Sequence, residues 1–193
     1  MTDQALTYLI VPGWNGSPDD HWQSHWQRTL PNARRVQQSN WQQPQRDAWV
    51  GRLQAAIEQS AGPVVLVAHS LGCITVAHWA ATADARLLQR VQGALLVAPA
   101  DVERQGCPQE LTGFAPVPQQ RLPFPSLVLG SSNDPAASAA RALDFAGWWG
   151  SQARILAGVG HINVASGHNQ WEQGFGWLYR LQALAGDAQR LCA

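Results

Sequence analysis

Apolar and polar positions divide this chain into short, continuously apolar runs and longer segments in which apolar residues recur every three or four positions. Short apolar runs bounded by turn residues indicate buried strands, whereas a period of three to four residues indicates helices. We expect strands at residues 6–11, 33–36, 64–69, 93–98, 127–130 and 154–157. We expect helices at residues 17–30, 46–59, 71–83, 135–145 and 171–185, the first of them capped by Ser17.

Strands therefore alternate with helices along the whole chain, and most of the strands are continuously apolar. This pattern predicts an α/β fold with a mostly parallel sheet of about six strands, flanked by helices on both faces. A length of 193 residues suits one domain, residues 1–193. Residues 99–125 are rich in proline, glycine and glutamine. We expect them to form a loop or a small flap over the functional site, and no full cap domain.

The stretch P-V-V-L-V-A-H-S-L-G-C-I at residues 63–74 carries the strongest functional signal. An apolar strand leads into Ser70, and a helical pattern begins directly after it. Small residues, Ala68 and Gly72, flank the serine two positions away on each side, as in a nucleophile elbow, which exposes a serine hydroxyl at the end of a strand. The alternative is that Ser70 is only a helix N-cap.

A nucleophilic serine needs a base, and a histidine after a late strand is well placed to supply it. His161 follows the last strand in the glycine-containing segment G-V-G-H-I-N at residues 158–163, which makes it the preferred candidate. His168 lies nearer the closing helix and is expected to support the site or to lie at the surface. His69, beside the serine, is expected to point away from it into the packing.

The base in turn needs an acid that orients the imidazole and stabilises its charged form. Asp134 follows the strand at residues 127–130 and is the preferred candidate, although an aspartate before proline is also an ordinary helix start. Asp101 follows the strand at residues 93–98 and is the alternative. Either residue satisfies the chain order Ser, Asp, His.

An oxyanion hole needs two backbone N–H groups directed at the developing negative charge. Leu71 should supply one of them, because it opens the helix after Ser70. The other should come from the loop after the first strand, where Trp14 is our first choice and Asn15 our second.

The composition excludes several other chemistries. The chain has no lysine, so Schiff-base catalysis, a Ser-Lys dyad and the phosphate-binding lysine of a P-loop are ruled out. The formal net charge is +0 and no basic stripe suggests nucleic acid. No segment has the length and apolarity of a membrane span, and residues 1–5 lack the charge of a signal peptide, so we expect a cytoplasmic protein without membrane attachment. The cysteines Cys73, Cys107 and Cys192 show no disulfide or zinc spacing.

Three further features favour structural roles. His21 and His25 are spaced as a zinc pair on a helix, but no third ligand is evident, so we expect no metal site. Tryptophans are abundant, and Trp22, Trp26, Trp148 and Trp149 are expected to pack in the core or line a pocket. Cys73 is expected to fill the core.

Four ordered motifs resemble the small serine hydrolases of the RBBP9/YdeN group. The first two are V-P-G-W-N-G-S-P with H-W-Q at residues 11–23 and A-H-S-L-G-C at residues 68–73. The later two are S-N-D-P at residues 132–135 and G-H-I-N at residues 160–163, with Ser166, Gly167 and Trp171. The resemblance implies a minimal α/β-hydrolase fold with a triad of Ser70, Asp134 and His161, and it implies that alanine is normal at position 68.

The residues and the resemblance together predict a serine hydrolase that cleaves a small ester through an acyl-enzyme on Ser70, with no cofactor. Thioester or amide hydrolysis would use the same groups. A non-catalytic module on a hydrolase scaffold, binding a protein or a ligand, is the alternative, because a fold does not settle a function.

Overall fold

The computed structural model describes residues 5–191; Cys192 and residues 1–4 lie outside this part of the chain. Six strands are present: β1 (Thr7–Val11), β2 (Ala33–Arg35), β3 (Val64–His69), β4 (Val91–Val97), β5 (Ser126–Ser131) and β6 (Gln152–Leu156). The α-helices are α1 (Trp22–Thr29), α2 (Arg46–Glu58), α3 (Leu71–Thr82), α4 (Ala85–Leu88), α5 (Ala139–Trp149) and α6 (Gly174–Leu191). Two short 3₁₀ helices, η1 (Gln109–Phe114) and η2 (Val164–Ser166), complete the fold.

All six strands are parallel and form one sheet in the order β2-β1-β3-β4-β5-β6. The predicted fold class is confirmed. The strand order reverses between β1 and β3, whose ends are paired at Val11 and Ala68. In open α/β sheets, ligands bind in the crevice beyond the carboxyl ends of the strands at such a reversal. The loops after β1 and β3 meet at this point.

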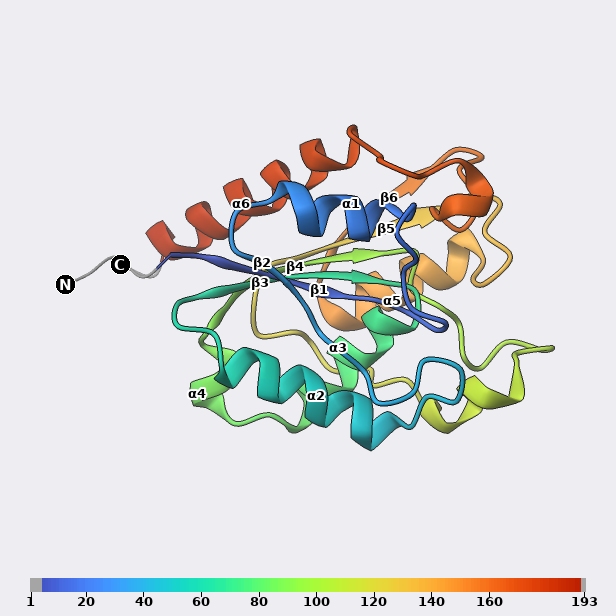
Figure 1. The fold of residues 1–193 in the computed structure, drawn as a ribbon, viewed down its shortest axis with the longest axis horizontal. Coiled ribbons are helices and arrows are strands. Elements are labelled where there is room, and N and C mark those ends of the chain that lie inside the picture. The colour runs from blue at the N-terminus through green and yellow to red at the C-terminus, as the bar shows by residue number, and fades with distance from the viewer. Residues whose placement is uncertain (1–4, 192–193) are drawn as a thin grey trace.

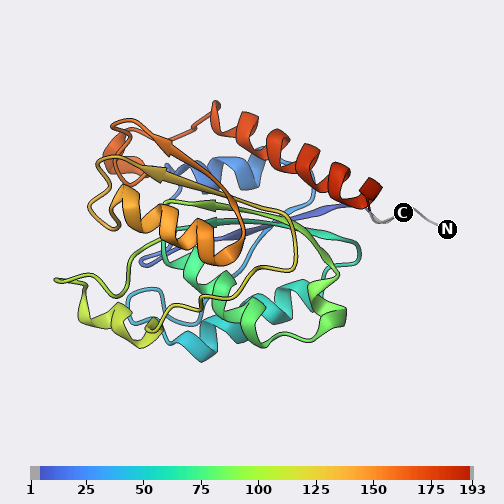
Figure 2. The same ribbon diagram turned by 180° about the vertical axis from the view of Figure 1, so that it is seen from behind.

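Helices cover both faces of the sheet, with α1 and α6 on one face and α2, α3 and α5 on the other (Figures 1 and 2). Because side chains alternate along a strand, each strand contributes to two cores. In β3, Leu66 and Ala68 pack with α2 and α3, whereas Val65 and Val67 pack with α1 and α6. Burial on both faces explains why the inner strands β1, β3, β4 and β5 are largely apolar, whereas the edge strands β2 and β6 carry exposed polar residues. Within the described residues, none of the helices combines the length and apolarity needed to cross a bilayer.

The expected start of the first helix was wrong. The helix begins at Trp22, and its N-cap is His21, whose Nδ1 accepts a hydrogen bond from the Gln23 backbone N–H at 3.1 Å. Ser17 instead donates from its hydroxyl to the Gln23 side-chain oxygen at 2.7 Å, while its carbonyl accepts a bond from Arg35. Ser17, which the local pattern predicted as the N-cap, is therefore engaged in hydrogen bonds with Gln23 and Arg35 instead.

Two later helices also start after their expected positions. Helix α5 begins at Ala139, because the Ser138 hydroxyl accepts the Arg141 N–H at 3.1 Å and caps it. It ends only at its C-cap Gly150, which adopts the left-handed conformation, so Trp148 and Trp149 lie inside the helix instead of after it. Helix α6 begins at Gly174. Trp171, which should have opened it, adopts φ +47° and packs its ring against Trp22 and Trp26.

Residues 99–125 include η1 and pack in the layer formed by α2 and α3. Leu111 and Phe114 of η1 are buried in that core, and the His78 side chain of α3 bonds the Phe114 carbonyl at 2.7 Å. Val117, Leu122 and Phe124 are buried in the same cluster. The segment is thus anchored along much of its length by its own apolar side chains.

Gly72 marks the closest approach between a helix and a strand. A Cβ added to it would lie 2.2 Å from the Val11 carbonyl oxygen, a distance no packed atom pair can adopt. The pattern of small residues around Ser70 therefore has a steric cause, since α3 begins directly against the end of β1.

We expect Gly72→Ala to destabilise the protein by more than about 2 kcal/mol, because either α3 or β1 must shift. Gly51→Ala is the matched control: Gly51 lies inside α2, and a Cβ there would meet no atom within 4 Å. That change should stabilise the protein by about 0.5–1 kcal/mol. Urea unfolding of both variants measures the difference, and equal effects would contradict the steric explanation.

Candidate active site

Ser70 stands between β3 and α3 in a strained backbone conformation, with φ 55° and ψ −123°. A positive φ is unfavourable for residues with a Cβ and costs on the order of 1–3 kcal/mol when the surroundings enforce it. The Ser70 N–H donates to the Val97 carbonyl at 3.0 Å, which helps hold the turn. Its side chain makes no cap hydrogen bond. The hydroxyl is therefore not used for helix capping.

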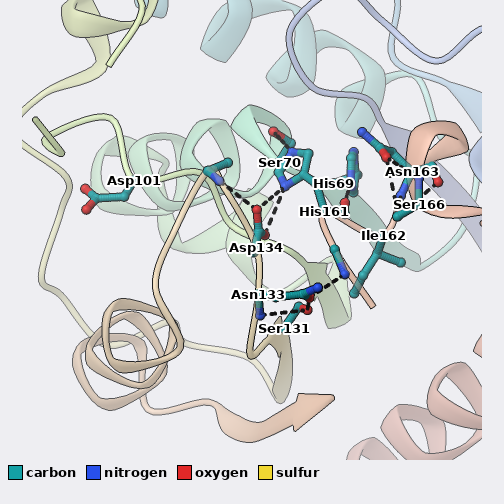
Figure 3. A network of polar contacts seen from close by, with 12 residues as sticks. His69, Ser70, Asp101, Ser131, Asn133, Asp134, His161, Ile162, Asn163 and Ser166 are labelled. Atoms are coloured by element: carbon teal, nitrogen blue, oxygen red, sulfur yellow. Dashed lines mark hydrogen bonds and ion pairs between the residues drawn. The ribbon is translucent and has the colours of Figure 1, made fainter. Parts of the chain in front are cut away.

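The structure brings Ser70, His161 and Asp134 together from three loops (Figure 3). His161 Nε2 lies 2.9 Å from the Ser70 Oγ. Its Nδ1 lies 2.9 Å and 3.0 Å from the two carboxylate oxygens of Asp134. The Asp134 side chain is almost fully buried, so it is shielded from water that would compete for the imidazole. The three groups form a continuous chain of hydrogen bonds.

Two side chains tie the loop of Asp134 to the loop of His161. The Asn133 Oδ1 accepts the Gly160 N–H at 2.7 Å, and the Ser132 hydroxyl accepts the Gly158 N–H at 2.9 Å. Asp134 is fixed in turn by its own loop, since its Oδ1 also accepts the Ala136 N–H at 2.7 Å. Neither Asn133 nor Ser132 was predicted to support the site. Their place beside Asp134 in the S-N-D-P motif was the signal that could have identified them.

Asp101, the alternative acid, lies elsewhere. Its carboxylate forms an ion pair with Arg141 at 3.3 Å and accepts the Glu103 N–H at 3.1 Å. Arg141 also pairs with Glu103, and Figure 3 shows the Asp101 carboxylate directed away from His161. Asp101 thus helps to hold the start of residues 99–125 against α5.

The other two histidines considered have separate partners. His168 lies 3.1 Å from the Ser166 hydroxyl through its Nδ1, and its ring packs edge-on against Trp171. His69 is buried, as expected, but it does not simply fill space. Its Nε2 lies 2.9 Å from the backbone carbonyl of His161, and the two imidazole centroids are 4.9 Å apart.

The loop after β1 passes directly beside the Ser70 turn. A Cβ added to Gly13 would lie 2.8 Å from the Ser70 Cβ and 3.1 Å from the Leu71 backbone nitrogen. The Asn15 N–H donates to the Trp41 carbonyl at 3.0 Å, so the second choice for the oxyanion hole is already bonded. The Trp14 indole is anchored by a 2.8 Å bond to the Gln42 carbonyl.

The spaced histidines on the first helix serve local structure. His21 caps α1, and His25 lies 3.5 Å from the Thr29 hydroxyl one turn later. Among residues 5–191, no group of three or more His, Cys, Asp or Glu side chains is arranged to hold a metal ion. Burial, followed by the nearby charge of Arg35, lowers the pKa of His21 to about 4. His21 is therefore neutral at physiological pH and keeps a lone pair on Nδ1 for the cap.

The parallel sheet with its strand-turn-helix serine defines the minimal α/β-hydrolase fold. A family model described as serine hydrolase matches residues 8–180. The chain therefore belongs to this family and is a serine hydrolase. A search of curated proteins found no significant match.

Solved structures agree with this assignment. A YdeN-like hydrolase of Pectobacterium atrosepticum is 32% identical, with a TM-score of 0.81 over 94% of this chain and 93% of the other. The ydeN gene product of B. subtilis is 19% identical, with a TM-score of 0.78 over 92% and 98% of the chains. A thermophilic esterase of Thermogutta terrifontis is 16% identical, with a TM-score of 0.64 over 92% and 91%. The last two likenesses support the fold alone.

We expect His21 to make the protein sensitive to acid. Its pKa is about 4 in the folded state and about 6.5 in the unfolded state. The neutral form of His21 therefore contributes to the free energy of unfolding above pH 6.5, and this contribution is lost as the pH falls toward 4. At pH 5 the loss is on the order of 2 kcal/mol.

Asparagine is a good N-cap that does not titrate, so His21→Asn should reduce the stability difference between pH 7.5 and pH 5 by about that amount. Denaturant unfolding at the two pH values measures this. An unchanged difference would show that His21 is not the responsible group. Part of the acid sensitivity should persist in the variant, because burial also holds the pKa of His69 well below its ordinary value.

Proposed function

We propose that this serine hydrolase cleaves small esters through an acyl-enzyme on Ser70, with His161 as general base and Asp134 as its orienting acid. One observation carries the proposal: the His161 ring bonds the Ser70 hydroxyl through Nε2 and the Asp134 carboxylate through Nδ1. Both contacts are needed, since the carboxylate fixes the tautomer that leaves Nε2 free to accept the serine proton.

In the first half of the reaction, Ser70 Oγ attacks the ester carbonyl while His161 Nε2 takes its proton. The carbonyl oxygen becomes an anion, and we assign the Leu71 and Trp14 N–H groups to stabilise it. Leu71 is the first residue of α3, where backbone donors have no partner within the helix. Gly13 brings the loop of Trp14 against the same turn. His161 then returns the proton to the leaving alcohol as the tetrahedral intermediate collapses.

In the second half, a water molecule replaces the alcohol. His161 removes a proton from the water as it attacks the acyl carbon, and the proton then passes to Ser70 as the acid departs. Asp134 stabilises the imidazolium in both halves. Every step uses side chains and backbone amides of this chain together with water.

A short acyl group suits the site best. Residues 99–125, the one stretch predicted as a loop or small flap, bury their apolar side chains Leu111, Phe114, Val117, Leu122 and Phe124 in the α2 and α3 layer. A deep pocket for a long acyl chain would need further chain segments around Ser70. Trp14, half-buried beside Gly13, offers apolar surface of limited extent.

A fluorophosphonate probe tests the nucleophile. Ser70 Oγ should displace fluoride, forming the O–P bond as the P–F bond breaks, with His161 accepting the serine proton. Wild-type protein should be labelled, and Ser70→Ala should be neither labelled nor active on a p-nitrophenyl ester of short chain length. Ester and thioester series of increasing acyl length define the substrate. Absence of labelling in well-folded wild-type protein would favour a binding module.

The acid is tested by a matched pair of variants. Asp134→Asn should lower kcat by about three to four orders of magnitude, because an amide stabilises the wrong tautomer of His161. Asp101→Asn should leave turnover within a few fold of wild type, since Asp101 pairs with Arg141 instead. The reverse result would transfer the role to Asp101.

A further inference from the structure

His69 is the most unusual buried group that the mechanism leaves unused. It is the last residue of β3, and the alternation of side chains directs it to the face covered by α1 and α6, opposite to Ala68. There its ring packs edge-on against Trp22 at 5.9 Å and His21 at 5.0 Å. An imidazole in an apolar cluster costs desolvation unless its nitrogens are bonded, so it should have a specific partner.

That partner is the backbone of the proposed base. His69 Nε2 lies 2.9 Å from the His161 carbonyl oxygen. A carbonyl can only accept, so His69 carries its proton on Nε2 and donates it. Burial, followed by the charges of His161 and His21, keeps the pKa of His69 well below its ordinary value. The donor is therefore a neutral imidazole that remains fixed while the ring of His161 gains and loses a proton.

The backbone that receives this bond is strained. Ile162 adopts φ +47°, which is unusual for any residue with a Cβ and most unfavourable for a β-branched one. Such a conformation persists only where surrounding contacts enforce it. Two consecutive carbonyls are bonded here, that of His161 by His69 and that of Ile162 by the Trp22 indole N–H at 2.8 Å. Figure 3 shows His69 beside the segment that contains them.

We propose that His69 is a positioning residue, which holds the main chain of His161 so that the Nε2 of His161 stays within reach of the Ser70 hydroxyl. This inference rests on the proposed function, because its effect is read through the turnover that His161 supports. Two residues adjacent in sequence bond different parts of His161: the Ser70 hydroxyl bonds its ring, and His69 Nε2 donates to its carbonyl oxygen. The C-terminal end of β3 thereby holds the nucleophile Ser70 and the base His161 in a fixed relative position.

The expected effect is on turnover and not on substrate affinity. A base displaced by about 1 Å can cost on the order of 100-fold in rate. His69 is buried, and its ring contacts Trp22, His21 and His161 on the face opposite to Ala68, so we expect KM to stay within about twofold. Labelling by a fluorophosphonate should slow in parallel with kcat, because both reactions need the same proton transfer.

Two amide variants separate the hydrogen bond from the packing. Glutamine places its N–H₂ group near the position of the imidazole Nε2, whereas asparagine is one methylene shorter and reaches only the position of Nδ1. His69→Gln should therefore retain turnover within about fivefold of wild type. His69→Asn should lower kcat by about 10- to 100-fold with little change in KM.

His78 provides a matched control. It lies on α3 and bonds the Phe114 carbonyl through Nε2 at 2.7 Å, the same type of contact at a place away from Ser70. His78→Asn should lower the melting temperature without changing kcat. If His78→Asn and His69→Asn reduce turnover equally, the effect is a general consequence of lost stability and the proposal fails.

A double variant tests whether His69 acts through His161. In a His161→Ala background, adding His69→Asn should leave the residual ester hydrolysis unchanged, because the group it positions is gone. An equal further loss in that background would overturn the proposal, as would wild-type kcat in folded His69→Asn.

The proposed function fails separately, if wild-type protein itself neither hydrolyses esters nor reacts with the probe. Should His69→Asn fold poorly, low turnover in folded His69→Gln would also contradict the inference.

Discussion

The hydrogen bond between His161 Nε2 and Ser70 Oγ forms only because several other parts of the structure hold the two residues in place. It joins the end of β3 to the loop after β6, although β4 and β5 lie between these strands in the sheet. The loop of His161 must therefore cross back over the sheet. It can do so because the Asn133 and Ser132 side chains hold it from the β5 loop, and the His69 and Trp22 side chains hold it from beneath.

Two residues with a strained backbone conformation lie at this contact. Ser70 and Ile162 both have positive φ; Ser70 carries the proposed nucleophile, and Ile162 directly follows His161. Such conformations each cost on the order of 1–3 kcal/mol, which surrounding contacts must offset. The two apolar cores supply that support, since strands buried on both faces and tightly packed helices leave the loop ends few alternative positions.

Most of the sheet could be read from the sequence, because strands buried on both faces must be apolar at nearly every position. The first residues of the helices were harder to predict from the sequence. Ser17 has the right chemistry for a cap, yet it bonds Gln23 and Arg35 across the fold. Trp171 continues the apolar period of α6, yet its ring packs with Trp22 and Trp26 outside the helix. Local propensity is a difference of about 1 kcal/mol, which a few tertiary contacts readily exceed.

The sequence by itself determined the parallel α/β sheet, the turn at Ser70 and a short set of candidate partners, because each has a local signature of apolar runs, small residues and positions after strands. Only the tertiary structure showed that His161 bonds Asp134 and that Asp101 pairs with Arg141 instead, since both acids follow parallel strands and differ in which loop they face. Only the tertiary structure likewise showed that the Asn15 N–H donates to the Trp41 carbonyl and that His69 lies beside the carbonyl of His161. A hydrogen bond between residues far apart in the chain forms only if the donor and acceptor are placed to within a few tenths of an ångström, and no local pattern encodes that placement.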